Sequence, residues 1–308
     1  MSSHEVLVIG RSCLDIISVV DRFPHENRKV PLSFRMQEGG GQGGTAACCI
    51  SRLGGSATYV ARLGDDAEGQ FCLQRLKDFA VDTGHVNIVK GGRTPVAYIF
   101  VTRSTGARTI IYENNALPRI ECTPELEILI SASGTILLDP ETTYLAKELD
   151  RLKSVDTRIV YDCERWRDGL SEMMAVADFF IPSFDFFEST MPDLGDQNLA
   201  EQMRSLKKQI RGELIVTSGE NGAYFIEGER LCRVAAPSVE AADTIGAGDN
   251  FHATFALAVA RGMRLHQSVE LAVASASMSC REYGGRNGIP TWKEAEAAAA
   301  RLTTETVA

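Results

Sequence analysis

The sequence predicts an α/β protein built on a doubly wound, mostly parallel sheet, and three observations lead to this prediction. Short apolar runs recur along the chain, and stretches of helical length separate them. The runs are almost continuously apolar, as in strands that helices cover on both faces. Two segments of alternating character, at about 14–38 and 93–115, interrupt this rhythm. We therefore expect one domain, residues 1–308, with a small antiparallel sheet projecting from it.

The alternation begins within the first 80 residues. Glu5–Gly10 is an apolar run closed by glycine, which predicts a buried strand. The small residues of Gly40–Leu53 predict a helix with a glycine stop. Thr58–Ala61 then predicts a strand, and Glu68–Phe79 an amphipathic helix. This β-α-β-α order is typical of a parallel sheet.

The same alternation resumes in the second half of the chain. Apolar runs predict four more strands, at Thr135–Leu138, Arg158–Tyr161, Phe179–Ile181 and Leu214–Thr217. Helices are expected at Tyr144–Leu152, Gly169–Ala177, Asn198–Ile210 and, near the end, Trp292–Leu302.

The second interrupting segment has the pattern of a hairpin. Val96–Val101 and Arg108–Tyr112 flank a Ser104–Gly106 turn. Turn-linked strands of this kind are antiparallel. Together with the first interrupting segment, they are expected to form a β-lid.

Composition excludes several classes of function. The formal net charge of −9 argues against a general affinity for nucleic acid or anionic membrane, because both need a positive face. The start lacks a basic leader, and no apolar run approaches the roughly 20 residues of a membrane span. We expect a cytoplasmic protein. The eight cysteines contain no paired spacing, so reduced, structural thiols are expected.

The residues Asp243–Asp249 read Asp-Thr-Ile-Gly-Ala-Gly-Asp and precede an apolar helix, expected at Asn250–Ala260. Uncovered amides at a helix N-terminus bind phosphate or stabilise developing negative charge. A carboxylate there, Asp249, is placed to accept a proton from a substrate hydroxyl. The alternative is a tight glycine turn with Asp249 as an ordinary helix-start residue. The functional interpretation predicts phosphoryl transfer to an alcohol.

The sequence resembles the ribokinase-like carbohydrate kinases, the phosphofructokinase-B group. The signature at Asp243–Asp249 matches, as do Gly39–Ala46 and Arg62–Gly69 near the N-terminus. Gly285–Gly288 resembles the family's late glycine loop. The resemblance implies a ribokinase-like fold and an ATP-dependent sugar kinase that uses Mg²⁺.

The family's functional positions carry over to matching residues of this chain. The anion-hole amides correspond to Gly246, Ala247 and Gly248, and the base to Asp249. Sugar contacts are expected from Asp15, Gly40, Gly41 and Gln42, although an Asp at a strand end, such as Asp15, also commonly caps a turn. The nucleotide is expected at Thr217, Ser218, Gly219, Gly222, Thr244, Gly285 and Asn287, with Cys280–Ile289 as the wall of the adenine pocket. K⁺ is a further expectation, at the carbonyls of Asp243 and Ile245.

Two departures narrow the resemblance. Gly44 stands where many members carry a sugar-binding Asn, and Ser183–Phe186 replaces the Asn-x-x-Glu motif that supports magnesium. Asp185 or Glu188 could compensate through water, or could be solvated carboxylates at a helix start. Ketohexokinases and sulfofructose kinases also lack the Asn-x-x-Glu pair, and the sulfofructose kinases lack the sugar-site Asn as well. These two branches therefore look most similar.

Four further residues are candidate sugar contacts. Lys29 resembles a lysine that meets the sulfonate of sulfofructose, although a lone lid lysine is usually just solvated. The stretch Leu138–Thr142 lacks the arginine expected beside an anionic group. Glu141 instead resembles the sugar-site Glu of ribokinases, at the end of a predicted strand. Arg108 and Tyr112 belong to the lid.

The resulting hypothesis is transfer of a phosphoryl group from MgATP to a primary hydroxyl of a ketose or related sugar. Alternatives are a sulfofructose kinase, a ribokinase or nucleoside kinase, and a catalytically silent sugar-binding regulator. The family's β-lid also implies a homodimer.

Overall fold

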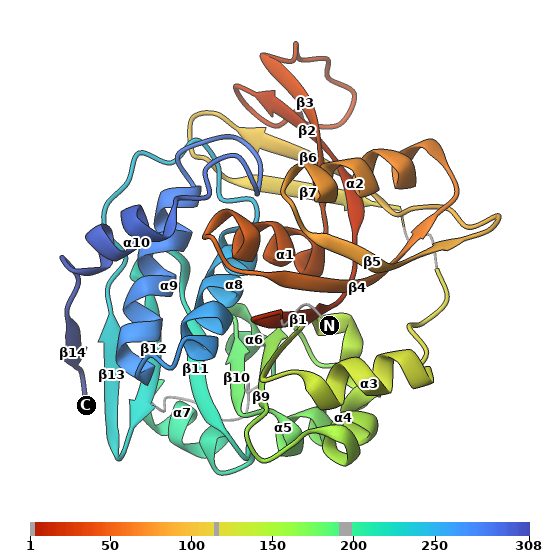
Figure 1. The fold of residues 1–308 in the computed structure, drawn as a ribbon. Coiled ribbons are helices and arrows are strands. Elements are labelled where there is room, and N and C mark those ends of the chain that lie inside the picture. The colour runs from red at the N-terminus through yellow and green to blue at the C-terminus, as the bar shows by residue number, and fades with distance from the viewer. Residues whose placement is uncertain (1–3, 114–116, 191–198) are drawn as a thin grey trace.

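The computed structural model describes residues 4–113, 117–190 and 199–308. Its main body is a ten-stranded sheet with helices on both faces, and a four-stranded sheet projects from it (Figure 1). The expected α/β fold, with a large mostly parallel sheet and a small, mostly antiparallel one, is confirmed.

The large sheet is parallel from β11 to β5 and ends in antiparallel strands on the other side. Its strands, in spatial order, are β14 (Thr304–Thr306), β13 (Arg230–Val234), β12 (Ala223–Glu227), β11 (Glu213–Thr217), β10 (Phe179–Pro182), β9 (Arg158–Cys163), β8 (Thr135–Leu138), β1 (Val6–Ile9), β4 (Ala57–Gly64) and β5 (Asp82–Val89).

Two helical layers cover the sheet because its parallel strands bury both faces. In β1, Val6 and Val8 join one core, while Leu7 and Ile9 join the other. The first core is packed by α1 (Gln42–Arg52), α8 (Ala247–Ala260), α9 (Leu265–Ser279) and α10 (Trp292–Ala299). The second is packed by α3 (Pro124–Ala132), α4 (Ala146–Leu152), α5 (Leu170–Val176), α6 (Phe184–Thr190) and α7 (Leu199–Lys207).

The small sheet is formed by the two interrupting segments; residues 114 and 115, expected at the end of the second, lie outside the described residues. Its order is β3 (Phe34–Gly40), β2 (Cys13–Val20), β6 (Val96–Thr102) and β7 (Arg108–Tyr112). The outer pairs are antiparallel, and the central pair, β2 with β6, is parallel because each enters the sheet from the main body. Helix α2 (Ala67–Asp78) packs Cys72 against this junction.

Two short 3₁₀ helices follow strand ends, η1 (Pro140–Leu145) after β8 and η3 (Gly219–Asn221) after β11. Within the described residues, no helix is long and apolar enough to cross a membrane.

Candidate active site

Helix α8 begins earlier than the sequence predicts. The expected start was Asn250, but the helix starts at Ala247, because Gly246 before it adopts a left-handed conformation with φ of 68°. Asp249 therefore lies inside the first turn. The N–H groups of that turn lack helical partners, and the helix dipole adds to their attraction for negative charge. The glycine motif is thus a helix start whose geometry suits the binding of an anion, and it is called the anion-binding helix start below.

A small cavity lies between the starts of α1 and α8. Its polar lining includes Gln42, Asp139, Asp162, Asp249 and His252. Asp139 directly follows β8 and Asp162 lies near the end of β9, so the carboxyl ends of neighbouring parallel strands supply both carboxylates. Three carboxylates and one imidazole thus meet around one cavity.

Burial is the main influence on the proton affinity of these groups, and neighbouring charges add to it. Burial, with the nearby charge of Asp162, raises the pKa of Asp249 to about 7, and His252 opposes this shift. Burial also raises the pKa of Asp139 to about 7 and lowers that of His252. A carboxyl group that titrates near neutral pH is suited to general-base work at that pH.

His252 connects the cavity to the first turn of α8. Its Nε2 lies 3.5 Å from an Asp162 carboxylate oxygen and 3.2 Å from the carbonyl oxygen of Ile181. Its Nδ1 lies 2.6 Å from the carbonyl oxygen of Gly248. The imidazole therefore connects the first turn of α8, which carries Asp249, to the ends of β9 and β10.

The predicted sugar motif joins β2 and β3 to the start of α1. The carboxylate of Asp15 lies directly against Gly40, where a Cβ would be 2.1 Å from Asp15 Oδ2. Gly41 precedes α1 with φ of 82°. Burial raises the pKa of Asp15 to about 6, and a hydrogen bond from the Cys13 thiol opposes the rise.

The sugar motif and the anion-binding helix start face each other. A Cβ on Gly246 would lie 3.2 Å from the Thr45 methyl carbon, and Gln42 and Gly43 line the same cavity as Asp249. Asp15 is near enough to contribute to the raised pKa of Asp249. Residues separated by more than 200 positions therefore form one site.

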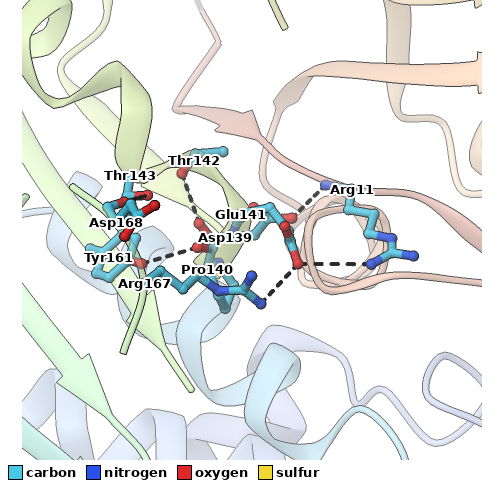
Figure 2. A network of polar contacts seen from close by, with 9 residues as sticks. All are labelled: Arg11, Asp139, Pro140, Glu141, Thr142, Thr143, Tyr161, Arg167 and Asp168. Carbon is cyan, nitrogen blue, oxygen red and sulfur yellow. Dashed lines mark hydrogen bonds and ion pairs between the residues drawn. The ribbon is translucent and has the colours of Figure 1, made fainter. Parts of the chain in front are cut away.

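Glu141 lies at the edge of this site in a polar network (Figure 2). Arg167 Nη2 is 2.8 Å from Glu141 Oε1, and Arg11 Nη1 is 3.8 Å from the same oxygen. Asp139 orders the turn, because it accepts hydrogen bonds from the backbone N–H groups of Arg11 and Glu141. The stretch Leu138–Thr142 itself lacks an arginine, but two arginines reach Glu141 from other segments.

The lid residues predicted as sugar contacts lie in different places. Arg108 on β7 donates a 2.7 Å hydrogen bond from Nη1 to Thr244 Oγ1, so the lid touches the anion-binding loop. Tyr112, at the end of β7, is 51% exposed. Lys29 lies exposed in the connection between β2 and β3.

The predicted nucleotide loop follows β11. Thr217 ends the strand and bridges to Ser183 after β10, and the Ser218 N–H donates to the Gly222 carbonyl. Gly219 and Gly222 both have positive φ. Gly222 is buried against the backbone of Val234, which leaves no room for a Cβ. The fold itself therefore requires glycine at this position.

The late glycine loop contacts the anion-binding loop. Asp243 accepts 2.8 Å hydrogen bonds from the N–H groups of Ile245 and Gly284. Asn250 Nδ2 donates to the carbonyls of Gly246 and Gly285, each at 2.9 Å.

The same late loop also lies along the lid. Phe34 stacks on Tyr283 with ring centroids 5.6 Å apart, and Asn287 is exposed and donates to the Tyr283 carbonyl. The segment predicted as an adenine wall therefore packs against strand β3.

Sequence reasoning missed several residues of this site. Asp139 and Asp162 carry the signal of an acid at the end of an apolar run, and His252 lies three positions after Asp249 on the same helix face. Glu38, buried on β3, and Arg286, whose buried side chain donates to the Gly40 carbonyl, gave no local signal. Asp185 is exposed at the start of α6, and the side chain of Glu188 lies outside the described residues.

No group of three or more His, Cys, Asp or Glu side chains is arranged to hold a metal ion within the described parts of the chain. Magnesium that arrives on nucleotide phosphates needs only one or two protein carboxylates.

Comparison with known proteins gives one consistent result. The family model described as pfkB family carbohydrate kinase matches residues 3–292. A ribokinase of Lactococcus lactis is 27% identical over 95% of this chain and 96% of its own length. A ketohexokinase of Mus musculus is 25% identical over 91% of this chain and 97% of its own. The solved structure of Arabidopsis thaliana ribokinase complexed with ribose and ATP superimposes with a TM-score of 0.81 at 23% identity, covering 96% of this chain and 99% of that one.

Proposed function

Because the chain belongs to the pfkB family of carbohydrate kinases, a family of phosphotransferases that act on sugar hydroxyl groups, we propose that it phosphorylates a primary hydroxyl of a ketose or related sugar. ATP is the phosphoryl donor in this proposal. The supporting observation is the convergence of the sugar motif and Asp249 on one cavity. The mouse relative is a ketohexokinase, which supports a ketose as acceptor.

The residues divide the reaction between them. Asp249 accepts the proton of the sugar hydroxyl, and Asp15 with the Gly40–Gly41 backbone orients the sugar. The N–H groups at Gly246–Asp249 face the transferring phosphoryl group and stabilise its charge. The O–H bond of the sugar and the bond from the terminal phosphorus to its bridging oxygen break, and a new sugar O–P bond forms.

ATP enters in this proposal as its magnesium complex, at the loop from Thr217 to Gly222. The Arabidopsis relative was solved with ATP, which supports this donor. Arg108 and Thr244 bring the lid to the phosphate end of the site. Asp185, exposed at the start of α6, lies within the segment that replaces the Asn-x-x-Glu motif and could support magnesium through water.

We also propose that a monovalent cation such as K⁺ binds beside the anion-binding loop. Hydrogen bonds hold Asp243 to Ile245 and to Gly284, so two loops lie together there. The backbone carbonyls of Asp243 and Ile245 would hold the ion, which would stabilise the anion-binding loop.

An assay of ATP consumption with fructose, sulfofructose, ribose, tagatose and nucleosides tests the proposal. We expect turnover of a ketose and a loss on the order of 100-fold or more in Asp249→Asn, because a positioned base is removed. Near-wild-type turnover by Asp249→Asn would show that Asp249 is not the base. Absence of turnover with every acceptor would favour a silent sugar-binding protein.

Sulfofructose is the second candidate acceptor. Arg11 and Arg167 flank Glu141 and offer positive charge at the edge of the site. Lys29 would add positive charge at the sugar only if the connection between β2 and β3 closes over it. In the same panel, a higher kcat/KM for sulfofructose than for fructose would favour this candidate, and the reverse would remove it. Turnover of ribose or nucleosides alone would favour the remaining kinase alternatives.

We further propose a homodimer that forms through the lid. Within the described residues, β7 is an edge strand of the small sheet, and its side chains Ile110, Ile111 and Tyr112 are 46%, 57% and 51% exposed. An exposed apolar edge strand is a ready template for pairing with another chain.

A further inference from the structure

Arg286 is a buried cation beneath the sugar motif. Its side chain is 1% exposed, and its Nη2 donates a 3.1 Å hydrogen bond to the carbonyl of Gly40. Its Nε and Nη1 have no hydrogen-bond partner among the described residues. Burying a guanidinium is costly unless its charge is paired and its N–H groups are hydrogen-bonded.

Two glycines leave the space that the guanidinium fills. A Cβ on Gly39 would lie 2.6 Å from Nη1, and a Cβ on Gly44 would lie 2.8 Å from Nη2. No side chain larger than hydrogen fits at either position without displacing Arg286. The sugar motif and Arg286 are therefore shaped for each other, although 246 positions separate Gly40 from Arg286.

Two buried carboxylates on the lid side are near enough to interact electrostatically with Arg286. Glu38 is 2% exposed and Asp15 is 8% exposed, and they are paired opposite each other on β3 and β2. Burial raises the pKa of Glu38 to about 7, and the Arg286 charge opposes this rise. The same charge also opposes the rise at Asp15. Arg286 thus stabilises the ionised form of a residue expected to bind the sugar.

The backbone beside Arg286 is fixed to the anion-binding loop. The Gly284 N–H donates to Asp243, and the Gly285 carbonyl accepts from Asn250 in the first turn of α8. Gly285 also lies against Gly246. The loop at residues 284–286 therefore contacts the anion hole through its backbone. It contacts the sugar motif through the side chain of Arg286.

We propose that Arg286 is a positioning residue that holds the sugar motif in register with the anion hole. The hydrogen bond to Gly40 and the attraction to Asp15 fix the acceptor side, while the backbone of Gly284 and Gly285 fixes the phosphoryl side. The inference rests on the proposed function, because it assigns the sugar to Asp15 and Gly40. A misplacement of about 1 Å between reacting groups lowers rates on the order of 100-fold.

Arg286→Gln and Arg286→Lys test this role, with Arg301→Gln as the control. Arg301 is exposed just after α10 and belongs to no part of the proposed site. We expect the Arg286 variants to raise KM for the sugar about tenfold or more and to lower kcat, with KM for ATP nearly unchanged. Lysine keeps the charge but lacks the planar fork, so it should not restore the sugar KM. The control should match the wild type.

Hydrogen exchange provides a readout that needs no turnover. In the Arg286 variants, amides of residues 39–45 should exchange faster than in the wild type and in Arg301→Gln. If Arg286→Gln does not fold, Arg286→Lys decides. Wild-type sugar KM and wild-type exchange in any folded Arg286 variant would overturn the proposal. A wild-type enzyme that phosphorylates no sugar would instead refute the proposed function, and the exchange comparison would then decide the role of Arg286.

Discussion

Asp249 shows how a single residue acquires its chemistry from its neighbours. An isolated Asp ionises near pH 4 and is a weak base at neutral pH. Here burial and the charge of Asp162 raise its pKa to about 7, while His252 limits the rise. The resulting proton affinity suits removal of a proton from an alcohol as the phosphoryl group departs from ATP.

The raised pKa predicts a specific pH dependence. Asp249 is a base only when ionised, so kcat/KM should increase as pH rises through about 7. Asp139 and Asp15 also titrate near this range, so the measured value belongs to the group of carboxyls. Initial rates from pH 5.5 to 8.5 at saturating ATP would measure it.

The residual activity of Asp249→Asn is the control for that profile, and it should not show the same inflection. A wild-type profile that is flat over the whole range would contradict a base with a pKa near neutrality.

The sequence predicts some residues of the site but not others. Asp15, Gly40, Gly41 and Asp249 could be predicted because each belongs to a motif of local spacing, and the structure brings these motifs together. Arg286 is different, because its partners Gly39, Gly40 and Gly44 are distant in sequence and glycines give no chemical signal of what fills their space.

At the scale of elements, the start of α8 contains two glycines with different reasons for being there. Gly246 has φ of 68° and lies against Gly285, so the fold itself leaves no room for a side chain at this position. Gly248 has no positive φ, is exposed, and has open space where a Cβ would lie. The fold alone therefore does not require glycine at 248.

The two glycines predict opposite behaviour on substitution. Gly246→Ala should lower the free energy of unfolding by about 1–3 kcal/mol and reduce activity. Gly248→Ala should leave stability unchanged or raise it by up to about 1 kcal/mol, because alanine favours helix. Its kcat/KM should nevertheless fall about tenfold or more, because the methyl group would occupy space that the phosphoryl group approaches. Denaturant unfolding and steady-state kinetics measure both, and a fully active Gly248→Ala would contradict the anion-hole assignment.

The elements that the sequence predicted well are those buried on both sides. The central strands β1, β4, β8, β9, β10 and β11 all lie within or beside expected runs. Strand β5 was missed because it lies at the edge of the sheet and mixes polar with apolar residues. Helix α9 was missed because it is rich in small residues and is recognised only through its packing on α8.

For the whole molecule, the proposed dimer gives a direct test. Wild-type protein should elute at twice the 33.5 kDa mass of the chain in light-scattering chromatography. Ile111→Glu should shift it toward the monomer, because a charge on the exposed lid strand would be buried at the interface. Val155→Glu is the matched control, since Val155 is 89% exposed in the connection between α4 and β9. A monomeric wild type, or an Ile111→Glu variant that remains dimeric, would contradict a lid-mediated dimer.

The fit between Arg286 and the glycines of the sugar motif limits how this enzyme can be recombined. A chimera that imports residues 13–44 from a relative would bring a foreign side chain to position 39 or 44 whenever the donor lacks glycine there. That side chain would collide with the guanidinium. We therefore expect such a chimera to retain more activity when the late loop that carries Arg286 is exchanged together with the sugar motif.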